Sequence, residues 1–367
     1  MAEIQLKALA HSYIANPAGP GDYAIRQLDH IWHKGGAYAL LGPSGCGKST
    51  MLNIISGLVQ PSEGDVLFDG KRVNELSPRD RNIAQVFQFP VIYDSMTVYE
   101  NLAFPLKNNK VPAAKIKTRV QEIAEVLEIE DKLHKKAKNL TADEKQKVSM
   151  GRGLVREDVS AILFDEPLTV IDPQLKWKLR RKLKQIHEQF DITMVYVTHD
   201  QLEASTFADK IAVMYDGQVV QFGSPTELFE APNHTFVGYF IGSPGMNIVE
   251  VERCSGGVRF GSIVLPLEAW QVELLERMET SNVKVGIRPE FIEISPVVSD
   301  DTYAAEVLDV EDLGTYKIVT AQLGGQEVKV RQNEEFDAIV GTRVDLSFPK
   351  QWLLLYVDEF LVQEQQP

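Results

Sequence analysis

The stretch Gly42-Pro43-Ser44-Gly45-Cys46-Gly47-Lys48-Ser49-Thr50 contains the residue types that bind a polyphosphate, in the pattern G-x-x-x-x-G-K-[ST]. Its glycines allow successive backbone N–H groups to face one point. Lys48 is expected to reach the β- and γ-phosphates of a nucleotide, and the Ser49 hydroxyl is expected to bind Mg²⁺. Thr50 adds a hydroxyl beside the α- and β-phosphates. The stretch predicts a nucleotide site, in which Cys46 is a small residue that fills the loop.

Two carboxylates, Asp165 and Glu166, follow the apolar residues Ala161-Ile162-Leu163-Phe164. At the carboxyl end of a strand, Asp165 could hold a water molecule bound to Mg²⁺, and Glu166 could orient or polarise the attacking water. Acidic residues after a strand are common in α/β proteins, so the pair is a weak signal alone. Together with the phosphate loop it predicts nucleotide hydrolysis.

Three further side chains are candidates for the same site. Gln88, just past an apolar stretch, could touch Mg²⁺ or the attacking water, or it could be a solvated loop residue. His199, in Val197-Thr198-His199-Asp200, could donate a hydrogen bond to a γ-phosphate, although a single histidine at a strand end is more often structural. Tyr13 could pack in the core or offer its ring to a base.

These residues need a parallel sheet to bring them together. The phosphate loop has the apolar run Tyr38-Ala39-Leu40-Leu41 before it and the helix-like Met51-Leu52-Asn53-Ile54-Ile55 after it. A helix that starts at such a loop directs the positive end of its dipole at the phosphates. Strands that are apolar throughout and alternate with helices predict an α/β fold with a sheet covered on both faces.

Other elements are expected around this sheet. Strands are expected near Ile4–Leu9, Gly64–Gly70, Ala84–Gln88 and Thr193–Val197, with a hairpin at Ile211–Phe222. From about residue 90 to 156 the pattern becomes helical. There, Ile116, Val120, Ile123 and Leu127 recur at steps of three and four and form one apolar stripe.

A domain boundary is expected near Gly242-Ser243-Pro244-Gly245. We predict a first domain over 1–240 and a second over 241–367. A helix is expected at Leu267–Met278. The expected strands of the second domain are Val283–Ile287, Ala305–Val310, Tyr316–Leu323, Glu327–Arg331, Arg343–Phe348 and Trp352–Val357. Short strands at regular spacing predict a small β-barrel.

The composition restricts the classes of function. The chain has 367 residues, enough for two or three domains, and its 38 basic and 52 acidic residues give a formal charge of −14. This charge argues against nucleic acid or an anionic membrane surface as the main partner. Only two cysteines occur, Cys46 and Cys254, so neither a disulfide framework nor a metal cluster is expected. Such a low cysteine content is typical of a protein in a reducing cytosol. No apolar run reaches membrane-spanning length, and a signal peptide is not expected because the N-terminus lacks its apolar core.

The order of the motifs resembles the ATPase subunit of an ATP-binding cassette (ABC) transporter. The order is the phosphate loop, Val86-Phe87-Gln88, a helical insert, Leu163-Phe164-Asp165-Glu166-Pro167 and Thr198-His199-Asp200. Near the C-terminus, the strings Gly242 to Asn247, Gly286-Ile287-Arg288-Pro289-Glu290 and Leu323 to Val328 are similar to the maltose-transporter type. That type serves importers for sugars, glycerol phosphate and polyols, and it carries an oligonucleotide-binding-like (TOBE) barrel after the P-loop cassette.

The resemblance implies roles for the residues singled out above. Tyr13 would stack on adenine, and Lys48, Ser49 and Thr50 would hold the phosphates of ATP and Mg²⁺. Glu166 would activate water, and His199 would sense the γ-phosphate. Gln88 would connect the nucleotide to the membrane subunits.

The resemblance also implies partners and a location. Two transmembrane permease subunits would bind the chain, and the helical insert would receive a coupling helix from a permease. A substrate-binding protein would be an indirect partner, and no nucleic acid is implied. The chain would be peripheral, at the cytoplasmic face of a bacterial inner membrane.

The signature segment departs from the family pattern. Members usually have Leu-Ser-Gly-Gly-Gln, which approaches the γ-phosphate held by the other subunit of a dimer, whereas this chain has Leu140-Thr141-Ala142-Asp143-Glu144. Ala142 and Asp143 place side chains where a bare backbone is needed. A carboxylate about 4 Å from a phosphate charge costs roughly 4 kcal/mol at an effective dielectric of about 20. Thr141 and Glu144 also form a capping box, so the helix supplies its own anion.

The segment after Glu166 departs as well, with Thr169-Val170-Ile171-Asp172 where members usually have Ser-Ala-Leu-Asp. Both changes fall on one of the two composite sites of a dimer. We therefore expect a heterodimer with a second, non-identical ATPase whose signature is intact. The alternatives are a homodimer that tolerates a drifted signature and a regulatory subunit that binds nucleotide with little hydrolysis. A cassette ATPase acting on ribosomes or DNA is disfavoured by the acidic charge and the barrel.

Overall fold

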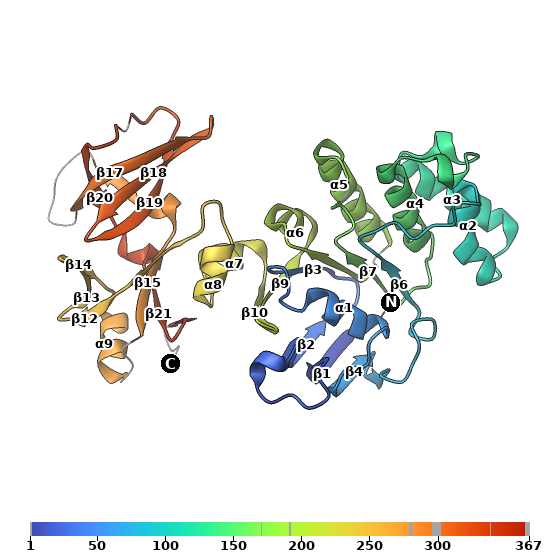
Figure 1. Cartoon of the computed structure of the whole chain (residues 1–367), viewed down its shortest axis with the longest axis horizontal. Helices are drawn as coiled ribbons and strands as arrows, with labels where there is room; N and C mark the ends of the chain where they lie inside the picture. Colours follow the sequence, from blue (N-terminus) through green and yellow to red (C-terminus); the bar gives the residue numbers. More distant parts are fainter. Residues whose placement is uncertain are drawn as a thin grey trace. The chain divides into compact units, whose positions relative to one another are not determined.

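The computed structural model describes residues 2–169, 171–190, 192–278, 282–295, 302–337 and 339–363. The chain divides after Pro225 into two units, Met1–Pro225 and Thr226–Pro367, which are described separately below (Figure 1).

The first unit is built on a six-stranded sheet with the strand order β10-β9-β3-β8-β7-β6. Its strands are β3 (Ala37–Leu41), β6 (Ile83–Val86), β7 (Ala161–Asp165), β8 (Met194–Thr198), β9 (Lys210–Tyr215) and β10 (Gln218–Gly223). All neighbours are parallel except β9 and β10, which form the predicted hairpin. Strands β3 and β8 are buried along their whole length, as expected of a parallel sheet that is covered on both faces.

A second, antiparallel sheet of this unit has the order β2-β1-β4-β5. Its strands are β1 (Ile4–His11), β2 (Ile25–Trp32), β4 (Glu63–Phe68) and β5 (Lys71–Arg72), and a short 3-10 helix, η1 (Pro20–Asp22), precedes β2. Both sheets share one core with helix α1 (Lys48–Ser56), which contributes Met51, Leu52, Ile54 and Ile55. The apolar residues after the phosphate loop therefore fix the helix that begins at the loop.

Five more helices complete the first unit. Helices α5 (Pro173–Phe190) and α6 (Gln201–Phe207) follow β7 and β8 in the chain. The predicted helical insert consists of α2 (Val98–Asn108), α3 (Ala113–Val126), α4 (Ala142–Leu154) and the 3-10 turns η2 (Glu130–Lys132) and η3 (Ala137–Asn139). Figure 1 shows α2, α3 and α4 gathered beside the β6 edge of the central sheet. The predicted apolar stripe of Ile116, Val120, Ile123 and Leu127 is buried.

The described part of the second unit contains three sheets in which every pair of strands is antiparallel. Their orders are β11-β15-β21-β22, β12-β13-β14 and β16-β20-β17-β18-β19. The strands are β11 (Asn247–Glu250), β12 (Glu252–Cys254), β13 (Gly257–Phe260), β14 (Ile263–Pro266), β15 (Val283–Ile287), β16 (Glu293–Ser295), β17 (Thr302–Asp312), β18 (Tyr316–Leu323), β19 (Gln326–Asn333), β20 (Arg343–Ser347), β21 (Leu354–Val357) and β22 (Phe360–Leu361). Side chains from all three sheets, among them Val258, Val285 and Val319, share one core.

The helices of the second unit are short. They are α7 (Pro225–Glu230), α8 (Thr235–Phe240), α9 (Ala269–Arg277) and the 3-10 turns η4 (Pro289–Phe291) and η5 (Lys350–Trp352). Helix α9 confirms the helix predicted at Leu267–Met278. The strands expected between Val283 and Val357 are present within three residues of their predicted ends, whereas the sequence did not predict β11 to β14, β16 or β22.

Arg288 explains why the chain divides at the start of α7 and not at the expected boundary after residue 240. Its guanidinium group is buried and donates hydrogen bonds to the carbonyl oxygens of Phe229 and Gly238, over 2.7 and 3.3 Å. It also donates to the carbonyl of Ile241. Arg288 therefore bonds helices α7 and α8 to the β-strands of the second unit. Burial of the guanidinium group lowers the pKa of Arg288 to about 10. The predicted division into domains over 1–240 and 241–367 stays a prediction.

Candidate functional site

The phosphate loop joins β3 to α1, as the sequence predicted, and two of its glycines are required by space. A Cβ atom at Gly42 would lie 2.3 Å from the carbonyl oxygen of Met214, and one at Gly47 would lie 2.4 Å from that of Ala24. Gly47 also has a φ of +102°, which favours glycine. Ser44 and Gly45 are exposed at the tip of the loop, so the backbone is open to a ligand there.

Lys48 is held by the loop itself. Its Nζ atom donates to the carbonyl oxygens of Gly42 and Pro43, both over 2.8 Å, and lies 3.9 Å from Sγ of Cys46. The lysine is only 5% exposed. Burial raises the pKa of the Cys46 thiol, although Lys48 opposes this, so Cys46 stays a neutral residue that fills the loop.

Ser49 and Asp165 are brought together from the loop and from the end of β7. The Ser49 hydroxyl donates to Oδ1 of Asp165 over 3.1 Å. Burial raises the pKa of Asp165, and the charge of Glu166 raises it further, whereas the hydrogen bond from Ser49 lowers it. A hydroxyl and a carboxylate are hard oxygen ligands, and Mg²⁺ usually takes one or two such protein ligands together with phosphate oxygens. This pair therefore fits the magnesium site predicted for Ser49 and Asp165.

Tyr13 lies just beyond β1, and its side chain is directed to the same loop. Its hydroxyl lies 3.2 Å from Oγ1 of Thr50, and its ring packs edge-on against His11 at 4.6 Å. The residue is 67% exposed, which excludes the alternative that the ring belongs to the core. One aromatic face is thus available beside α1, at the position where a base could stack.

The strand register brings the remaining candidates to one edge of the central sheet. Leu41 of β3 pairs with Thr198 of β8, and Asp165 of β7 pairs with Val197. Since β6 runs parallel to β7, Gln88 leaves the sheet at the same edge as Glu166. The residues after these four strands are the phosphate loop, His199, Glu166 and Gln88.

Glu166 and His199 are in direct contact. Nδ1 of His199 lies 3.1 Å from Oε2 of Glu166. Glu166 has a φ of +45°, unusual for a residue with a side chain, and its N–H donates to the carbonyl of Val197 over 3.0 Å. The hydroxyl of Thr169 donates to the Glu166 carbonyl over 3.0 Å. Val170, which follows in the same segment, lies outside the described residues.

A buried carboxylate that the sequence analysis missed supports the position of His199. Glu203 of α6 accepts hydrogen bonds from the Tyr196 hydroxyl over 3.0 Å and from the Thr198 hydroxyl over 2.9 Å. Lys176 and Arg180 of α5 lie 3.5 and 3.9 Å from its other oxygen. Thr198 directly precedes His199, so this cluster fixes the end of β8.

The altered signature segment lies at the start of α4, and its capping box is present. Thr141 accepts a hydrogen bond from the N–H of Glu144 over 3.4 Å, and its own N–H donates to Oε2 of Glu144 over 2.9 Å. The Thr141 hydroxyl also donates to Asp143. Lys132 lies 3.0 Å from Oε1 of Glu144. Leu140 is buried and Ala142 is exposed, so the first turn of α4 presents side chains, not bare backbone.

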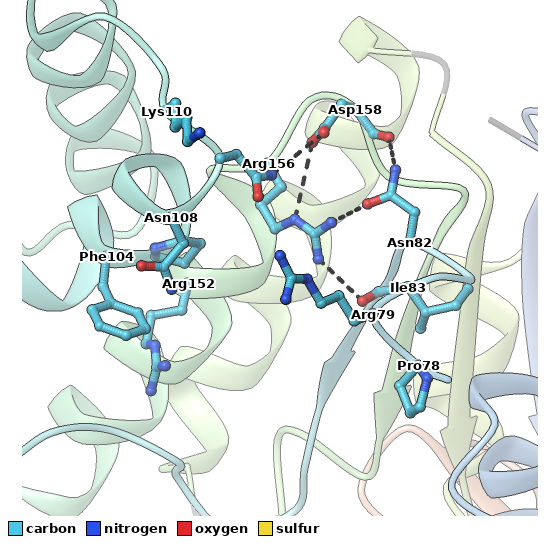
Figure 2. Close-up of a pocket in the computed structure, with 12 residues that line it drawn as sticks. Pro78, Arg79, Asn82, Ile83, Phe104, Asn108, Lys110, Arg152, Arg156 and Asp158 are labelled. Carbon is cyan, nitrogen blue, oxygen red and sulfur yellow. Dashed lines mark hydrogen bonds and ion pairs between the residues drawn. The ribbon is translucent and has the colours of Figure 1, made fainter. Parts of the chain in front are cut away.

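A pocket of about 960 Å³ lies between the helical insert and the central sheet, lined by residues of α2, α4 and the loop before β6 (Figure 2). Arg156 donates to the Ile83 carbonyl over 3.1 Å and lies 4.0 Å from Asp158. Arg152 extends beside Phe104 and packs over the ring of Tyr93 at 4.8 Å. Arg79 and Lys110 are also in the lining, so four cations and one carboxylate, Asp158, face this pocket.

The phosphate loop and the polar residues at the neighbouring strand ends define the class of P-loop ATPases. Comparison with family models gives the particular family. Residues 25–169 match the model described as ABC transporter, 242–292 the MalK OB fold domain and 285–355 the TOBE domain. The last two matches agree with the predicted barrel after the cassette.

Curated proteins similar to this chain cover nearly its whole length. The oligosaccharides import ATP-binding protein MsmX of Bacillus subtilis is 36% identical over 95% of both chains. The trehalose/maltose import ATP-binding protein MalK of Thermococcus litoralis is 40% identical over 86% of this chain and 91% of the relative. The sn-glycerol-3-phosphate import ATP-binding protein UgpC of Bordetella avium is 37% identical over 90% and 89%. The chain therefore belongs to the family of ABC transporter ATP-binding proteins and is an ABC ATPase.

Solved structures agree with this family. The chain is similar to cbiO1 of Clostridium perfringens, part of the ABC transporter complex cbiONQ, with a TM-score of 0.56 and 28% identity over 62% of this chain and 90% of that one. It is also similar to the dimeric ATP-binding cassette MJ0796 bound to ADP and Pi, with a TM-score of 0.54 and 29% identity over 60% and 98%. None of the helices in the described ranges is both long and apolar enough to cross a membrane.

Proposed function

We propose that this chain hydrolyses ATP to drive the import of a carbohydrate, a polyol or a glycerol phosphate through two membrane permease subunits. The observation that carries this proposal is the meeting of the phosphate loop, Glu166 and His199 at one sheet edge. The solute class follows the relatives, which are named for the import of oligosaccharides, trehalose or maltose, and sn-glycerol-3-phosphate. The chain would act at the cytoplasmic face of a bacterial inner membrane, and a substrate-binding protein would deliver the solute.

In this proposal each side chain at the sheet edge has one task. Glu166 accepts a proton from the attacking water, and His199 holds the Glu166 carboxylate in position through the 3.1 Å contact. Lys48 and the loop N–H groups bind the phosphates, and the exposed Tyr13 ring stacks on the base. Ser49 and Asp165 would hold Mg²⁺, which neutralises phosphate charge when it is bound. Gln88 would connect this edge with the helical insert.

We assign the docking of a permease helix to the pocket between the insert and the central sheet. The family resemblance places a coupling helix at the insert, and this pocket borders α2 and α4. Its four cations in a chain of charge −14 suit a segment that carries carboxylates. Phe104 and Tyr93 supply apolar surface beside the guanidinium group of Arg152.

The pairing of two ATPase subunits is a separate proposal that depends on the signature segment alone. The names of the relatives do not mention a second ATPase, so they give no support to a heterodimer. At the start of α4 the Thr141 hydroxyl bonds to Asp143, and the side chains of Thr141 and Glu144 bond to each other's backbone N–H, which leaves this end less suited to a phosphate. We therefore propose that a non-identical ATPase supplies the signature opposite this chain's phosphate loop.

Reconstitution of the purified chain with two candidate permease subunits, with and without a second ATPase, tests the main proposal. Vesicles that contain the complex should take up solute only when ATP is present on the side of the ATPase and the substrate-binding protein on the opposite side. Binding of ATP without hydrolysis in the complete complex would instead indicate the regulatory subunit. Turnover by the chain alone at the rate of a mixed pair would contradict the heterodimer and indicate a homodimer.

A further inference from the structure

A buried amide in α4 contacts two loops at the proposed site. Gln146 has no exposed surface, and its Nε2 atom donates to the carbonyl oxygens of Phe87, over 3.1 Å, and of Pro167, over 2.9 Å. Phe87 directly precedes Gln88, and Pro167 directly follows Glu166. One side chain of the helical insert is thus bonded to the backbone beside both residues.

The chemistry of these contacts determines the orientation of the amide. Both neighbours are carbonyl oxygens, so only the NH₂ group of Gln146 can face them, and both of its N–H donors are used. Its Oε1 atom is buried and has no hydrogen-bond partner among the described residues. Since buried polar atoms are nearly always paired, an apolar side chain would fill this position better if packing were the only requirement.

The position of the two loops makes the contact functionally relevant. Strands β6 and β7 are adjacent, with Val86 paired to Phe164, so the segments after them leave the sheet side by side. The amide therefore joins the Gln88 segment, the Glu166 segment and the helix that begins at the signature. A shift of α4 relative to the sheet would reach both segments through this one group.

We infer that Gln146 is a positioning residue that sets the Gln88 and Glu166 segments relative to each other and transmits movement of the helical insert to both. The inference rests on the proposed roles of Glu166 and Gln88. It does not require Gln146 to touch the nucleotide, and it concerns a residue outside the altered signature, Leu140 to Glu144.

The test uses the full chain in three forms: wild type, Gln146→Met and Gln121→Met. Methionine has nearly the volume of glutamine but no donor, so it removes both hydrogen bonds while the site stays filled. Gln121 is an exposed glutamine on α3, which bonds only to Glu125 among the contacts described, and it controls for the exchange of residue type. Gln146→Asn keeps the amide on a shorter side chain and serves as the second variant if Gln146→Met does not fold.

Hydrogen exchange and ATP affinity are measured on each form, and turnover is measured on the transporter assembled with each form. We expect faster exchange in both segments, 87–91 and 166–169, with no change in β7 or α5. We also expect at least a tenfold loss of kcat with less than a twofold change in the Kd for ATP. A change in only one segment, a uniform change across the unit, or turnover within twofold of wild type would overturn the inference. If the transporter assembled with the wild-type chain shows no turnover, the proposed function fails, whereas a paired change in exchange still supports the link between the segments.

Discussion

Nδ1 of His199 lies 3.1 Å from Oε2 of Glu166, so the side chains that directly follow the neighbouring strands β8 and β7 are in contact. This contact places a histidine against the carboxylate that we propose as the base. Glu203 fixes the residue before His199, and Gln146 bonds to the residue after Glu166. A buried polar side chain therefore holds the neighbouring residue of each partner in this contact.

Replacement of Glu166 by glutamine should abolish most of the hydrolysis and leave ATP binding intact. A positioned base contributes about 10²–10⁴-fold to a rate, so we expect a loss of at least about a hundredfold in kcat. Phosphate release from the assembled transporter measures it, and Glu188→Gln, an exposed glutamate on α5, is the matched control. In a heterodimer the same change in the partner ATPase should cost much less, and equal losses would refute the asymmetry.

Tyr13→Ala should weaken ATP binding, because the exposed ring would be lost as a stacking surface. Stacking of a base on an aromatic side chain is worth about 1–3 kcal/mol, so the Kd should rise by about tenfold or more. Tyr13→Phe keeps the ring and loses only the contact with Thr50, and its Kd should stay within about threefold of wild type. Equal effects of the two changes, measured by titration with a fluorescent ATP analogue, would argue against stacking.

Asp165→Asn should stabilise the chain while it impairs the proposed Mg²⁺ site. Burial raises the pKa of Asp165 in the folded protein, so its ionised form disfavours folding. This cost is fully present above the raised pKa and disappears as the pH falls below the ordinary value of 3.8. At neutral pH we expect the Tm of the variant to rise by about 1–3 °C, and the difference should vanish in acid. A Tm that falls at neutral pH would contradict the claim that the ionised Asp165 carboxylate destabilises the folded chain.

Restoring glycine in the signature should increase the turnover of the chain on its own. The double variant Ala142→Gly, Asp143→Gly lacks the two side chains that we expect to obstruct a phosphate. Its kcat should rise at least fivefold, which corresponds to about 1 kcal/mol of activation free energy. The glycines should cost stability, roughly 1–2 kcal/mol in all. Asp143→Asn removes the charge and keeps a side chain of the same size, so it distinguishes electrostatic repulsion of the phosphate from steric obstruction. If turnover stays the same in both variants, the signature is not what limits the lone chain.

Charge reversal in the pocket should weaken docking and spare the ATP site. Arg79→Glu adds a carboxylate where we propose that an acidic segment of a permease binds, so the Kd for the membrane subunits should rise by about tenfold at low salt. The lone chain should hydrolyse ATP at its usual rate. Lys178→Glu, an exposed lysine of α5, gives the control for a change in net charge. Docking that is equally weak in both variants would remove the pocket from the interface.

The sequence predicted the phosphate loop and the strand ends because buried parallel strands are continuous apolar runs followed by polar residues. It failed for β11 to β14, β16 and β22, since strands of two to four residues are too short to show alternation. Their pairing is determined by the shared core of the second unit, which brings together residues far apart in the chain.

Part of the candidate site also could not be read from the sequence. Gln146 bonds to backbone carbonyls, which every residue type supplies, so no pattern of side chains marks its partners. The cations of the pocket come from positions 79, 110, 152 and 156 and form a cluster only in the folded chain. The exposure of Tyr13 and its contact with Thr50, which exclude a place in the core, also arise only in the folded chain.

The contacts of Lys48 have a consequence for how a polyanion meets the loop. The carbonyl oxygens of Gly42 and Pro43 carry partial negative charge, and the ammonium group covers both. Without the lysine, these two dipoles would repel an approaching phosphate. Lys48 thus acts as an internal counter-ion for the loop, in addition to its proposed role as a ligand for the nucleotide, and its removal should convert part of an attractive surface into a repulsive one.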